Sequence, residues 1–199
     1  MFAKNAHRLF LFSILSLLLS ACAFRGSELP RDIAWPLASA GTKTVQFTVS
    51  ASGTANGKAD FFAANDLLWR QGVSKEFAAS GLFSSVRDVS GRKEAGTTAD
   101  VQIDMVGRDD KSFSRLLSHL NETSLFIVPS RKRTVYTLTS TFGDPQGQVL
   151  GIIEKKQSVV YWSHLFLAPF APFDGNAWAE ARADLVKATL AEARQLGYL

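Results

Sequence analysis

The chain has 199 residues, 46% of them hydrophobic and 11% aromatic, which excludes a disordered tail and predicts a packed core. The formal net charge is +4 at pH 7, and it falls to +2 without the first 21 residues, which hold two basic and no acidic residues. This small excess does not indicate the marked basic surface of a nucleic-acid-binding protein, so no nucleic-acid partner is expected. A single cysteine excludes an internal disulfide.

The N-terminus has the pattern of a secretory signal. Lys4 and Arg8 precede an apolar run from Leu9 to Leu19. The run is about half the ~20 residues that a membrane-spanning helix needs. Small residues, Ser20 and Ala21, follow it, as they do before a signal cleavage site.

The sequence Leu19-Ser20-Ala21-Cys22 resembles the lipobox of bacterial lipoproteins. This resemblance implies a diacylglyceryl group on the Cys22 thiol, cleavage between Ala21 and Cys22, and acylation of the new amine. An ordinary signal peptide and an uncleaved anchor are the alternatives, and the position of the only cysteine favours the lipobox. In such proteins an Asp after the cysteine retains the protein at the inner membrane. Ala23 in that place implies the outer membrane, with the domain facing the periplasm.

Residues 22–42 contain scattered Gly and Pro without a clean period, so they are predicted to be the lipidated N-terminus and a tether to a domain of residues 43–199. Val45, Phe47 and Val49 alternate with polar residues and predict a half-buried strand. Residues 60–80 predict a helix, because Trp69, Val73 and Phe77 lie on one apolar stripe. Gly81 is predicted to end this helix.

Further along the chain, residues 82–89 predict a short strand, and residues 101–107 predict a second one with alternating apolar residues. Phe113, Leu116, Leu117 and Leu120 have helical spacing. Residues 134–142 and 149–162 are β-prone and flank a turn sequence, which predicts a long hairpin. Residues 168–176 are predicted to be irregular, with Asn176 capping a final helix that Gly197 ends.

The resulting order β-α-β-β-α-β-β-α predicts a single α+β two-layer domain, with a mixed, mostly antiparallel sheet and about three helices on one face. The helix closed by Gly81, then Leu82-Phe83-x-x-Val86, a loop and Ala99-Asp100-Val101, resembles small envelope lipoprotein domains. The amino-terminal domain of TolB and the curli-secretion lipoprotein CsgG are examples. Beyond Cys22 of the lipobox, the resemblance assigns no functional residue.

No catalytic, metal or cofactor motif stands out. The mature chain has only His119 and His164, at no ligand spacing, whereas a zinc site needs about four placed ligands. Asp100 and Asp104 share a strand face, which favours a solvated face over acid–base catalysis. We therefore expect no metal, no cofactor and no enzymatic activity.

Two features near the hairpin each allow two interpretations. Arg131-Lys132-Arg133 and Lys155-Lys156 contact anionic lipid headgroups, or they protect a strand edge, which is favoured. The apolar run 159–173 is a buried strand with its exit wrapped over the core, or an exposed patch for a partner protein or the bilayer interface. The candidate interaction residues of that patch are Trp162, Phe166, Phe170 and Phe173.

These observations predict a lipid-anchored domain that works as a non-enzymatic interaction or assembly module, with another envelope protein as its partner. A carrier of a small ligand or lipid, using a cavity beneath the run 159–173, is the first alternative. An envelope hydrolase that pairs a serine with His119 or His164 is the second.

Overall fold

The computed structural model describes residues 24–30, 33–38, 41–60, 65–91, 99–124, 127–164 and 171–199. Its strands are β1 Phe24–Arg25, β2 Lys43–Ala55, β3 Lys58–Ala59, β4 Phe83–Asp88, β5 Val101–Phe113, β6 Ser130–Gly143 and β7 Val149–Ser163. Its helices are α2 Asp66–Ala79, α3 Arg115–Thr123 and α4 Ala171–Gln195. No helix in these ranges combines the length and the apolar content that crossing a membrane requires.

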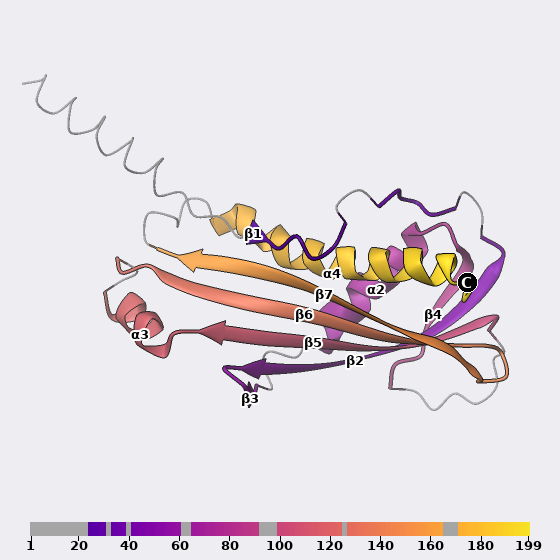
Figure 1. The fold of residues 1–199 in the computed structure, drawn as a ribbon, viewed down its shortest axis with the longest axis horizontal. Helices are drawn as coiled ribbons and strands as arrows, with labels where there is room; N and C mark the ends of the chain where they lie inside the picture. The colour runs from indigo at the N-terminus through magenta and orange to yellow at the C-terminus, as the bar shows by residue number, and fades with distance from the viewer. Residues whose placement is uncertain are drawn as a thin grey trace, which may run out of the picture.

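In the described part of the chain, seven strands form one mixed sheet in the order β1-β7-β6-β5-β2-β3, and β4 pairs with β2 as well. Strand β2 runs parallel to β4 and β5, and the other neighbours are antiparallel. Helices α2 and α4 cover one face of the sheet, and the short α3 lies at one end of it (Figure 1). This confirms the predicted α+β class and the predicted order of the longer elements.

Alternation along the strands separates the two faces. Val45 and Phe47 of β2 are each 1% exposed, and Ile103 and Met105 of β5 are likewise 1% exposed. Phe47 is paired with Ile103 in the parallel register, so the apolar residues of both strands point to the same side. The residues between them point to the opposite side, which no described helix covers (Figure 1). We call these two sides the covered face and the open face.

The two long helices complete the core against the covered face. Trp69, Val73 and Phe77 of α2 are at most 1% exposed, which confirms the predicted stripe. Asn65 caps α2 by accepting a hydrogen bond from the Leu68 amide at 3.1 Å. Helix α4 contributes a parallel row of buried residues, among them Ala181, Leu185 and Ala193.

The predicted hairpin is confirmed as β6 and β7. The Asp144 carboxylate at its turn accepts hydrogen bonds from the amides of Gln146 and Gln148, at 2.9 and 2.8 Å. Gly147 has a positive φ of 82°, a conformation that glycine adopts without steric penalty. This local turn chemistry fixes the register of the two longest strands.

The segment before β2 lies against the domain. Phe24 and Arg25 pair with Val160 and Val159 of β7. Leu29 belongs to the core, and Ile33, Trp35 and Leu37 pack against it. The predicted tether is thus attached in its described part, because its short strand pairs with the edge of β7 and its apolar side chains pack against the core.

Three element boundaries differ from expectation. Strand β5 continues past Gly107 to Phe113, and α3 begins after Ser114, whose hydroxyl accepts from the Leu117 amide. Helix α4 begins at Ala171, so the irregular segment and the cap predicted at Asn176 are wrong there. Pro172 does not prevent this early start, because amides of the first helical turn have no intrahelical partner for a proline to remove.

Candidate functional site

A cavity opens on the covered face between the start of α2, helix α4 and the ends of β5, β6 and β7. Its volume is about 410 Å³. Its walls combine aromatic rings with charged groups. They are formed by Asn65, Leu68, Asp109, Lys111, Phe113, Lys132, Thr134, Tyr136, Tyr161, Trp178 and Arg182. We call this space the Asp109 cavity.

Asp109 is placed in the cavity by the alternation of β5. It lies on the same side of the strand as Ile103 and Met105, next to Tyr136 of β6 in the antiparallel register, and it is only 4% exposed. The Trp69 indole N–H of α2 donates a hydrogen bond to its carboxylate at 3.0 Å. One buried acidic group therefore holds a strand and a helix together.

Burial raises the pKa of Asp109 to about 6, because the ionised carboxylate loses its hydration. The hydrogen bond from Trp69 and the positive charge of Arg182 favour the ionised form and oppose this rise. Burial also raises the pKa of Tyr136 to about 12, and the charge of Asp109 adds to the effect. The phenol of Tyr136 therefore stays neutral, whereas Asp109 changes its charge close to neutral pH.

Cations lie over the aromatic rings of this site. The Arg182 guanidinium is 5.5 Å from the ring centre of Tyr136 and 6.0 Å from that of Trp69. The Lys132 ammonium is 5.9 Å from the ring centre of Phe113. With Lys111, three cations and one carboxylate line the cavity, which suits a small ligand with an apolar body and an anionic group.

Gly107 makes room for this arrangement. A Cβ atom at this position would lie 2.6 Å from Cε2 of Trp69, closer than any real contact allows. The site was not predicted from the sequence, because the predicted strand ended at this glycine. Continuing the alternation through Gly107 would have placed Asp109 on the buried side.

Trp162, the described residue of the predicted interaction patch, does not line this cavity. Trp162 lies near the end of β7 and is 39% exposed, with the Arg131 guanidinium 6.0 Å from its ring centre. Cys22, Phe166 and Phe170 lie outside the described residues, as does the side chain of Phe173. The run 159–173 is mixed in its described part, because Val159 is buried while Trp162 is exposed.

The predicted pair of acids has a structural role on the open face. The hydroxyl of Thr44 donates to Asp100 at 2.8 Å, and that of Thr48 donates to Asp104 at 2.7 Å. The amide and hydroxyl of Thr44 lower the pKa of Asp100. These bonds link β2 to the start and middle of β5, which confirms that the two acids lie on a solvated face.

Neither histidine joins the Asp109 cavity. His119 is exposed on α3, and His164 directly follows β7. In the described ranges, no three His, Cys, Asp or Glu side chains lie close enough to hold a metal ion.

The basic residues of the hairpin have different surroundings. Lys155 faces α4 and forms an ion pair with Glu192, whereas Lys156 pairs with Glu154 on the open face at 2.9 Å. Lys155 therefore attaches a helix to the sheet.

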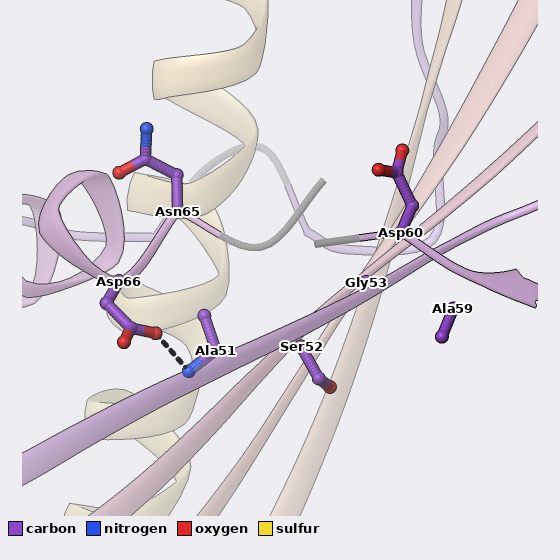
Figure 2. A pocket seen from close by; sticks show the side chains of 7 residues that line it. All are labelled: Ala51, Ser52, Gly53, Ala59, Asp60, Asn65 and Asp66. Atoms are coloured by element: carbon purple, nitrogen blue, oxygen red, sulfur yellow. Dashed lines mark hydrogen bonds between the residues drawn. The ribbon is translucent and has the colours of Figure 1, made fainter. Parts of the chain in front are cut away.

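A second, shallow pocket lies beside the outer edge of β2, with a volume of about 520 Å³ (Figure 2). The Asp66 carboxylate at the start of α2 accepts a hydrogen bond from the Ala51 amide at 2.6 Å, as Figure 2 shows. The Asp60 amide donates to the Gly53 carbonyl at 2.9 Å. The chain thus satisfies exposed edge groups of β2 itself, which protects the strand from unwanted pairing.

No family model matches the sequence, and no curated protein matches it. Several solved structures align with most of this chain. A Xanthomonas campestris protein of family DUF330 has 13% identity and a TM-score of 0.45, over 84% of this chain and 94% of that one. A minor lipoprotein from Acinetobacter baumannii has 8% identity and a TM-score of 0.40, over 76% of this chain and 93% of that one. PelC from Paraburkholderia phytofirmans, solved as a dodecamer, has 13% identity and a TM-score of 0.37, over 83% of this chain and 94% of that one.

The solved structures similar to this chain thus include a lipoprotein. With TM-scores below 0.5, these similarities carry no assignment of function.

Proposed function

We propose that this protein is anchored by lipid on Cys22 to the outer membrane of a bacterium, and that its periplasmic domain is a non-enzymatic interaction module. The lipobox Leu19-Ser20-Ala21-Cys22 and the Ala23 that follows support the anchor and its location. Two or more acyl chains hold a protein on a bilayer stably. The anchor confines the domain to a surface, so that a contact of modest affinity suffices for binding.

The observation that carries the interaction role is a group of exposed apolar side chains at the turn of the hairpin. Val149, Leu150 and Ile152 are 59%, 43% and 64% exposed. We call these three residues the hairpin patch. Clustered exposed apolar groups mark binding sites for partner proteins.

The hairpin patch is at the end of β7 opposite to β1, where the described chain begins (Figure 1). Residues 159 and 160 of β7 pair with β1, whereas the patch begins at residue 149. A protein anchored through its N-terminus therefore presents this patch to another envelope protein away from the point of attachment.

Site-specific photo-crosslinking in intact cells tests this role. A benzoylphenylalanine at Ile152 is expected to form a discrete adduct with one envelope protein, and Leu150→Ser is expected to reduce that adduct at least tenfold. The same probe at Gln71, which is exposed on α2, is the control. Equal adducts from both positions, or an adduct unaffected by Leu150→Ser in a folded protein, would contradict the proposal.

The Asp109 cavity favours a second candidate function, the binding of a small amphiphilic anion. Its volume lies within the roughly 300–1,000 Å³ range of ligand pockets, and Tyr161 of the predicted apolar run lines it.

The fluorescent anion anilinonaphthalene sulfonate is a suitable probe for binding in the Asp109 cavity. We expect it to bind in one site and to lose at least tenfold in affinity in Arg182→Gln, with Arg194→Gln as the exposed control on α4. Equal affinity in both variants would exclude this use of the cavity.

A further inference from the structure

Helix α3 has its polar side towards the domain and its apolar side outward. Ser118 and Asn121 are 8% and 3% exposed, whereas Leu116, Leu117 and Leu120 are 69%, 42% and 41% exposed. A helix that belongs to the core buries its leucines instead. We call the three outward leucines the α3 leucine face.

Hydrogen bonds fix α3 in this orientation. The Ser118 hydroxyl is 3.3 Å from that of Ser130 at the start of β6. The side-chain amide N–H of Asn121 donates to the Ser163 carbonyl at 3.1 Å, and the Ser163 hydroxyl donates to the side-chain oxygen of Asn121 at 2.9 Å. Both strand ends are therefore bound to the polar side of α3, and the leucines have no place in the core.

Strand β1, where the described chain begins, lies at this end of the molecule. Strand β1 is antiparallel to β7, with Arg25 beside Val159 and Phe24 beside Val160. The N-terminal end of β1 therefore points in the direction of Ser163, to which α3 is bound. Cys22 precedes Phe24 by two residues, which span at most about 7 Å. A lipid on Cys22 holds this end of the domain, not the hairpin patch, at the bilayer.

Exposed residues at the same end of the sheet suit a membrane surface. Ile127 is 58% exposed and Trp162 is 39% exposed, and tryptophan is enriched at the bilayer interface. Arg115, at the start of α3, and the exposed run 131–133 of β6 supply four cations. Of these, Arg133 has a carboxylate nearby, that of Glu28 at 3.8 Å, and Glu122 is the acidic residue of α3 itself. The excess of positive charge attracts anionic headgroups.

We propose that the α3 leucine face, together with Ile127 and Trp162, inserts into the phospholipid surface to which Cys22 is anchored. This inference rests on the lipid anchor of the proposed function and adds a defined orientation to it. The sheet then extends away from the membrane. Val149 lies 14 residues from Ser163 along β7, or about 45 Å of strand.

Nitroxide depth measurements on the full mature protein test the orientation. Leu116→Cys and Val149→Cys replace residues of similar exposure, 69% and 59%, at opposite ends of the sheet. Each variant is spin-labelled after reconstitution into vesicles of phosphatidylethanolamine and phosphatidylglycerol. At position 116 we expect collisions with oxygen to exceed those with a water-soluble nickel complex severalfold. At position 149 the ratio is expected to be reversed.

Mass spectrometry of the same samples separates the two proposals. If Cys22 is acylated and both labels are equally accessible to the nickel complex, the proposed insertion of the α3 leucine face is wrong, whereas the proposed lipid anchor is confirmed. If the label at position 116 is shielded from both oxygen and the nickel complex, a protein surface covers α3. That outcome also contradicts insertion of the α3 leucine face into the membrane. A bare Cys22 thiol with no retention on vesicles overturns the anchor and, with it, the orientation.

Discussion

Asp109 and Asp110 are neighbours in the chain, but they lie on opposite faces of the sheet. Asp109 is buried on the covered face with the Trp69 indole as its donor, and its pKa is raised to about 6. Asp110 lies on the open face, where it accepts from the Thr54 hydroxyl at 2.7 Å and pairs with Arg108 at 2.9 Å. The comparison shows that the layer covering a strand, rather than the residue type, decides whether a carboxylate stabilises a sheet or becomes a titrating site.

The largest expected difference between the two faces is in packing. Leu138 of β6 is 0% exposed on the covered face, so Leu138→Ala should lower the free energy of unfolding by about 2–5 kcal/mol. Ile152 of β7 is 64% exposed, and Ile152→Ala should change it by less than about 0.5 kcal/mol. Urea unfolding followed by circular dichroism measures both. Similar losses in the two variants would show that the open face is covered in solution.

The next effect is the pH dependence of stability. Since the pKa of Asp109 in the folded protein is about 6 and its ordinary value is 3.8, the folded protein binds this proton more tightly than the unfolded chain does. Ionisation therefore destabilises the fold. The contribution of this group to the free energy of unfolding should fall by about 2 kcal/mol as the pH rises from 4 to 7.

Urea unfolding at several pH values isolates this contribution. Asp109→Asn keeps an oxygen that accepts from Trp69, and it should remove the fall in stability between pH 4 and 7 relative to the wild type. Asp110→Asn is the matched control and should show the same fall in stability between pH 4 and 7 as the wild type. If the two variants show the same pH profile, Asp109 does not titrate in this range.

A smaller effect is expected from filling the space beside Trp69. Gly107→Ala places a methyl group 2.6 Å from the indole, so Trp69 must move, and the free energy of unfolding should fall by about 1–3 kcal/mol. A change in near-ultraviolet circular dichroism should accompany the loss. Gly72→Ala on α2 is the control, since a methyl group there meets nothing within 4 Å and alanine favours the helix. An unchanged near-ultraviolet spectrum in Gly107→Ala would contradict the tight contact.

The smallest effect concerns the bonds between β2 and β5 on the open face. Thr48→Val retains the shape of the side chain and removes the hydrogen bond to Asp104, so it should lower the free energy of unfolding by about 0.2–1 kcal/mol. The same urea titration measures it. A loss above about 2 kcal/mol would mean that this bond is not exposed to solvent.

Local patterns predicted the elements well where one physical preference dominated. The alternation in β2 and β5, the stripe of α2 and the Asp144 turn of the hairpin each depend on nearby residues, and all are confirmed. The start of α4 and the continuation of β5 beyond Gly107 were missed. In both cases a proline or glycine was taken as an end, although the backbone position tolerates it.

The candidate site was harder to predict because its parts come from distant segments. Trp69, Asp109, Tyr136 and Arg182 belong to four different elements, and no spacing in the chain links them. The helical spacing of the leucines in α3 was visible, but the direction in which they point was not. The side chains of Ser118 and Asn121 decide that direction by binding the ends of β6 and β7.

By itself, the sequence determined the α+β order and the binary pattern of the strands, and it predicted the lipid anchor at Cys22. Short-range periodicity and turn chemistry suffice for these features, since they involve residues within a few positions of one another. Only the tertiary structure decided that residues 24–30 and 33–38 lie on the domain, that Asp109 is buried, and that the leucines of α3 face outward. Each of these depends on which surfaces the folded layers cover, and burial is a property of the assembled layers rather than of any one segment.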